Sequence, residues 1–136
     1  MTDIDLDHIE DIVRAKAALE RKTKQGDIES VTNMVRAERF AAATFKELKT
    51  TAKECVNRYN ATAAREIVPP LKVTADSLRA FTAVTADEQG SFSLTIEGAT
   101  IKYSRATRQR PLEEWTLRAN DAARVRAKLM EFLWEA

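Results

Sequence analysis

Glycine and proline are scarce in this sequence of 136 residues, which contains three of each. The phosphate-binding loops of P-loop proteins and of dinucleotide-binding proteins need several closely spaced glycines. Gly26, Gly90 and Gly98 stand far apart, so both kinds of loop are excluded. Neither glycine nor proline occurs between Gly26 and Pro69, and this interval therefore favours a long helix.

Cysteine and histidine occur once each, as Cys55 and His8. A lone cysteine excludes an intrachain disulfide and favours a reducing compartment. Zinc sites need three or four cysteine or histidine ligands. The acidic residues at positions 3, 5 and 7 imitate a calcium loop, but His8 and Arg14 occupy the positions that require Gly and Glu. We expect no metal and no cofactor.

Catalytic side chains show no recognisable arrangement. Cys55 falls on the apolar stripe of a predicted helix, where burial raises a thiol pKa and favours a structural cysteine. Glu113 and Glu114 are neighbours on a predicted strand, so they face opposite sides and cannot form an acid–base pair. The sequence therefore favours a non-catalytic protein, although a site assembled from distant segments stays open.

The net charge of +1 gives no general attraction to polyanions or membranes. The charges are nevertheless uneven, because residues 1–13 carry five acids and no base, whereas residues 99–128 carry eight bases and three acids. No signal peptide is recognisable, and no apolar run approaches the roughly 20 residues that span a bilayer. We expect a cytoplasmic protein.

Two helices are predicted in the first half of the chain. The first covers residues 2–25, with Thr2 as its cap, and ends at Gly26, where Asp27 caps the next. From Ile28 onward apolar residues recur three or four apart, which predicts a helix to about residue 60 or 66. About 32 residues make a helix about 48 Å long, more than the roughly 35–40 Å diameter of such a domain. This helix must bend, break, or be covered by the first helix or by a second copy.

After Pro70 the periodicity changes to two, which predicts strands. Alternating apolar residues indicate strands over 91–97, 100–104 and 114–118, and a fourth strand over 78–85 competes with a short helix that begins at Thr74. Asn120 caps a final helix. The sequence thus predicts an α+β fold: an N-terminal helix, a long second helix, a three- to four-stranded antiparallel meander, and a C-terminal helix packed on the sheet.

A single domain over residues 1–136 is expected, because the chain has the size of one domain and 44% hydrophobic residues. Its helical part covers residues 1–66, the antiparallel sheet covers 71–118, and the C-terminal helix covers 120–136.

The favoured functional hypothesis is a protein-interaction module that forms a homodimer through the long second helix. The upper part of its apolar stripe would be shared with the sheet, and Cys55 of two copies could then meet. The residues expected at the interface are Val31, Val35, Phe45, Leu48 and Tyr59.

A rival hypothesis is binding of nucleic acid or an acidic partner through the basic hairpin 102–118. Bases interleaved with aromatic residues are typical of single-strand-binding sheets. Alternation, however, places Tyr103 and Trp115 on the inward face, so this hypothesis is not favoured. Its residues are Lys102, Arg105, Arg108, Arg110 and Arg118.

Three further alternatives remain open. A small apolar ligand could bind between the sheet and its covering helix. Met130 and Trp134 either fold back over the sheet or form an exposed patch for a partner. The acidic N-terminal helix could also lie against the basic hairpin of its own chain or of a neighbour.

Overall fold

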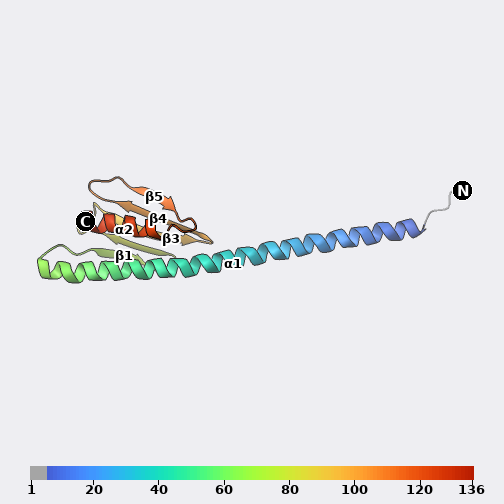
Figure 1. Ribbon diagram of the computed structural model, residues 1–136, viewed down its shortest axis with the longest axis horizontal. Coiled ribbons are helices and arrows are strands. Elements are labelled where there is room, and N and C mark those ends of the chain that lie inside the picture. Colours follow the sequence, from blue (N-terminus) through green and yellow to red (C-terminus); the bar gives the residue numbers. More distant parts are fainter. Residues whose placement is uncertain (1–5) are drawn as a thin grey trace. The chain divides into compact units, whose positions relative to one another are not determined.

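The computed structural model describes residues 6–136, with side chains from residue 9 onward. The Thr2 cap and the acidic cluster at positions 3–7 lie outside this range. The elements in chain order are α1 (Leu6–Glu66), β1 (Lys72–Asp76), β2 (Ala80–Val84), β3 (Ser91–Glu97), β4 (Thr100–Ala106), β5 (Glu113–Thr116) and α2 (Ala122–Glu135) (Figure 1). The predicted α+β class, with an antiparallel sheet and a C-terminal helix, is confirmed.

Contacts divide the chain into two compact units, Met1–Ala37 and Glu38–Ala136, and α1 contributes to both. That the whole chain folds as one domain stays a prediction. The second unit holds the sheet, α2 and the C-terminal half of α1.

The prediction that a first helix ends at Gly26 is wrong, because Gly26 lies inside α1. A glycine in a helix interior costs about 1 kcal/mol relative to alanine, which is too little to end a helix among good helix formers. The lysines and glutamine before it, Lys22, Lys24 and Gln25, are such residues. Asp27 therefore continues the helix and does not cap a second one.

The helix ends at Glu66, at the farther of the two predicted boundaries. Asn60, a predicted fraying point, instead anchors the following segment: its side-chain amide donates to the carbonyl of Leu71 at 3.0 Å and accepts from the Leu71 amide at 2.7 Å. Beyond Glu66 the Val68 amide bonds to the carbonyl of Ala63 at 2.9 Å, which is the helix-ending bond of a Schellman motif. Ile67 occupies the left-handed position of that motif, with φ of 58°.

The sheet is a five-stranded antiparallel meander in the order β1-β2-β3-β4-β5. The expected three or four strands omit β1, which begins at Lys72 and includes Thr74, so the short helix that competed there is absent. This edge strand is mostly exposed and carries a register shift between Val73 and Ala75. Such a strand has no alternating apolar pattern to betray it.

One face of the sheet is buried. Register places Phe81, Leu94, Tyr103 and Trp115 in one row across β2 to β5. The core cluster joins this face to both helices; its members are Ala41, Phe45, Leu48, Ala52, Val56, Leu71, Phe81, Ala83, Phe92, Leu94, Ile101, Tyr103, Val125, Leu129 and Phe132. Two ion pairs also attach β1 to α1, from Asp76 to Lys49 at 2.6 Å and to Lys53 at 2.8 Å.

Candidate functional site

The five predicted interface residues fall into two groups. Phe45 and Leu48 are buried in the core of their own chain, and Tyr59 is half-buried and packs against it. Val31 and Val35 are exposed. The sheet therefore covers the C-terminal part of the predicted stripe, and only its N-terminal part is free for a second copy.

The first unit is an exposed helical segment. From residue 9 to residue 37 every side chain that the structure describes is exposed, except the half-buried Ala17. Its exposed apolar side chains gather in two places. One group contains Ile9, Ile12 and Val13, and the other contains Ile28, Val31, Met34 and Val35.

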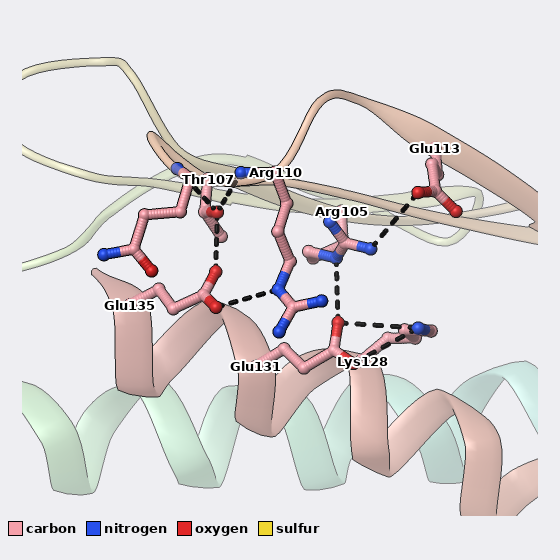
Figure 2. A network of polar contacts seen from close by, with 8 residues as sticks. Arg105, Thr107, Arg110, Glu113, Lys128, Glu131 and Glu135 are labelled. Atoms are coloured by element: carbon pink, nitrogen blue, oxygen red, sulfur yellow. Dashed lines mark hydrogen bonds and ion pairs between the residues drawn. The ribbon is translucent and has the colours of Figure 1, made fainter.

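Arg105 is the residue that sequence reasoning misplaced. It is 1% exposed and lies on the buried face of β4. Figure 2 shows its guanidinium between two carboxylates: Nε lies 3.1 Å from Glu131 of α2, and Nη2 lies 3.8 Å from Glu113 of β5. Neither Nε nor Nη1 forms an aligned hydrogen bond with the residues described, so ion pairing is what holds this buried charge.

Arg110 lies in the same polar network, on the loop between β4 and β5. Its Nε donates to Glu135 at 2.8 Å, and the Thr107 hydroxyl donates to the other oxygen of that carboxylate at 2.6 Å (Figure 2). The Thr107 hydroxyl, followed by Arg110, holds the pKa of Glu135 below its ordinary value. The C-terminal end of α2 is thereby fastened to the β4–β5 loop.

The remaining predicted basic residues are exposed. Arg108 pairs with Asp87, and Lys102 lies 3.7 Å from Glu114. The side chain of Arg118 makes no ion pair within residues 9–136. The hairpin therefore brings most of its cations to carboxylates of the same chain and does not collect them on one open surface.

The aromatic residues of the hairpin face the core. Tyr103 is buried and stacks on Trp115 with 5.4 Å between ring centroids. Burial raises the pKa of Tyr103. Cations of the same chain surround the half-buried Trp115: the guanidinium carbons of Arg105 and Arg124 lie 5.4 and 5.8 Å from its ring centroid, and Nζ of Lys128 lies 4.8 Å away. These contacts leave no free platform for base stacking.

A pocket of about 280 Å³ opens where α1, α2 and the loop after β2 meet. Tyr59, Leu71 and Phe132 contribute apolar walls, and Thr107 and Glu135 are polar neighbours. This pocket is the place where the predicted small apolar ligand would bind.

An apolar groove of about 580 Å³ lies next to this pocket, between the last turns of α1 and α2. Cys55 and Tyr59 line it from α1, and Met130, Leu133 and Trp134 line it from α2. Of the two alternatives for Met130 and Trp134, the structure has the exposed patch: Met130 is 56% and Trp134 is 90% exposed.

Within the described residues no three His, Cys, Asp or Glu side chains are grouped as metal ligands, and no helix there is long and apolar enough to cross a membrane. Comparison of the chain with models of protein families, with curated proteins and with solved structures finds no match. The candidate sites therefore consist of the exposed apolar surfaces of α1 and α2.

Proposed function

We propose that this chain is a non-catalytic interaction module that self-associates through the exposed apolar residues of α1. The observation that carries the proposal is the exposure of Ile28, Val31 and Val35, which follow one another at intervals of three and four. This spacing places them on one face of a helix. It is also the spacing by which two helices interlock in a coiled coil.

The energetics of α1 support this proposal. Most helical stability in proteins comes from the packing of an apolar face, because helix propensity alone is marginal in water. The described part of the first unit has exposed side chains almost throughout. Its own ion pairs, from Arg14 to Glu10 at 3.6 Å and to Asp11 at 3.7 Å, are exposed and contribute little. A second copy would cover the apolar face.

The interface in this proposal is smaller than the five residues of the sequence prediction. It keeps Val31 and Val35 and adds their exposed neighbours Ile28 and Met34. Phe45 and Leu48 are left to the core. Binding of nucleic acid through the basic hairpin receives no comparable support, since Arg105 is buried.

Light scattering of Val31→Glu/Val35→Glu against the wild type tests the proposal. We expect the wild type to have an oligomeric mass at micromolar concentration and the variant to lose this association, because the glutamates place charge in the shared seam. Asn33→Glu/Ala37→Glu is the matched control, with the same charge and the same spacing on the opposite face of the helix. Equal masses for the wild type and Val31→Glu/Val35→Glu would contradict the proposal, as would an equal loss in the control.

A further inference from the structure

Helix α2 presents three different faces. Val125, Leu129 and Phe132 are buried against the sheet. A second face carries the side chains that meet β4 and β5, including Lys128 and Glu131. The third face is exposed and apolar, and its residues are Ala123, Ala127, Met130 and Trp134. We call this third set the α2 apolar face.

The α2 apolar face is a continuous ridge. Its four residues are spaced by four, three and four positions, so they lie one above another along the helix. None of them is charged, and Trp134 is among the most exposed large side chains of the described chain. Single exposed apolar residues are ordinary on protein surfaces, whereas an aligned set that ends in an exposed tryptophan is typical of a contact surface.

The order of side-chain sizes along this ridge makes it complementary to itself. Ala123 and Ala127 are small and occupy the N-terminal half, whereas Met130 and Trp134 are large and occupy the C-terminal half. Two copies of α2 can lie antiparallel about a twofold axis midway between residues 127 and 130. Ala123 of one copy then lies opposite Trp134 of the other, and Ala127 lies opposite Met130. Each large side chain therefore meets a small one.

The flanking charges agree with the same arrangement. Arg124 and Glu131 lie on the same side of the ridge, at its N-terminal and C-terminal halves. In an antiparallel pair about a twofold axis, equivalent flanks of the two helices meet, so Arg124 of one copy approaches Glu131 of the other. A parallel pair would instead place Arg124 beside Arg124 and Trp134 beside Trp134, which combines like charges with a steric clash.

We infer that the α2 apolar face is a twofold-symmetric docking surface for a second copy of this chain. This contact is separate from the association proposed for α1, and neither depends on the other. An interface made by four residues from each copy is smaller than the roughly 1,200 Å² of a stable complex. The contact is therefore weak on its own, and it strengthens when α1 also holds the copies together.

Exchanging the small and large residues tests this inference. The variants are Ala123→Trp, Trp134→Ala and the exchange Ala123→Trp/Trp134→Ala, each also made with Val31→Glu/Val35→Glu to remove the α1 association. Sedimentation equilibrium from about 10 µM to about 1 mM covers the affinity range of a small interface. All four changed positions are exposed, so circular dichroism should show the same fold in every variant.

We expect the Val31→Glu/Val35→Glu background to dimerise at the upper end of this range. Adding Ala123→Trp should weaken that dimer at least tenfold, because two tryptophans then collide. Trp134→Ala should weaken it as well, and the exchange should restore it because each large residue again meets a small one. A surface that is merely sticky would bind more tightly after Ala123→Trp, and that result would overturn the inference.

The two proposals fail in distinguishable ways. If the α1 association is absent, the wild type and Val31→Glu/Val35→Glu have the same dimer affinity, and Ala123→Trp still weakens it. If the α2 contact is absent, Val31→Glu/Val35→Glu is a monomer at every concentration, which overturns the present inference and leaves the α1 proposal intact.

Discussion

Nε of Arg105 on β4 lies 3.1 Å from a carboxylate oxygen of Glu131 on α2, and this ion pair links the sheet to its covering helix inside the core. Both side chains are largely withdrawn from water: the Arg105 side chain is 2% exposed and that of Glu131 is 27% exposed. A charge buried in this way is tolerated only while its partner is present. Arg105 is therefore a structural residue of the domain.

Replacing Arg105 should destabilise the protein strongly. Arg105→Ala removes one member of a buried pair and leaves a cavity, so we expect the free energy of unfolding to fall by about 3–5 kcal/mol. Arg105→Met/Glu131→Met removes both charges and keeps most of the volume, so its loss should be less than half as large. Urea unfolding followed by circular dichroism measures both. A loss below about 1 kcal/mol for Arg105→Ala would contradict the buried ion pair.

Asp76 should make stability depend on pH. Its hydrogen bonds with Lys49 and then with Lys53 lower the pKa of its carboxyl below the ordinary 3.8. A carboxyl whose pKa is depressed by folding stabilises the protein above the unfolded pKa, and this contribution is lost as the pH falls through the folded pKa. Asp76→Asn should therefore destabilise the protein at pH 7, and the difference from the wild type should disappear under acid conditions.

Thermal unfolding of Asp76→Asn and the wild type from pH 7 down to below the ordinary carboxyl pKa measures this difference. Glu97→Gln is the control, because it neutralises an exposed carboxylate on β3. A constant difference between Asp76→Asn and the wild type across the whole range would show that ionisation of Asp76 is not the cause.

Ile67→Gly should stabilise the protein. Ile67 has φ of 58° at the end of α1 and is 94% exposed, so its side chain gains little from burial. A left-handed backbone costs a residue with a Cβ roughly 1–2 kcal/mol, and glycine avoids this cost. We expect the free energy of unfolding to rise by about 1 kcal/mol. Ile67→Ala keeps a Cβ and should gain much less, and equal gains for both variants would remove backbone strain as the explanation.

Gly26→Ala should strengthen α1. A Cβ added at Gly26 would meet no atom within 4 Å, and alanine is favoured over glycine by about 1 kcal/mol in a helix interior. Greater helix content and a higher melting temperature by circular dichroism are the expected results. Reduced helicity would instead indicate that the chain needs a break at this position, as the sequence alone suggested.

The parts of the fold visible in the sequence are those with local periodicity. Phe92, Leu94 and Ile101 alternate with polar neighbours, and the structure places each on the buried face of its strand. The same alternation also assigns Arg105 to the face of Ile101 and Tyr103, opposite Lys102. Arg105 was expected at the surface because it is charged, although its position in the strand indicated burial.

Other features depend on residues that are distant in the chain. The carboxylate partner of Arg105 comes from α2, 26 positions later, and no spacing rule connects the two. Gly26 is a typical helix end, yet its cost is smaller than the propensity of its neighbours to continue the helix. Exposure of Trp134 likewise depends on which face of α2 meets the sheet, which is set by Val125, Leu129 and Phe132 together.

The meander topology has a consequence for how this chain reaches its native state. Each strand pairs with the strand that follows it in the sequence, so the sheet requires only short loops to close. Rapid folding is characteristic of proteins whose contacts are local. The hairpins of residues 72–116 can form one after another as the chain leaves the ribosome, and α2 is the last to arrive. The earlier-made residues 41–63 of α1 must then wait for an apolar surface, which makes this segment the part of the nascent chain most in need of protection from aggregation.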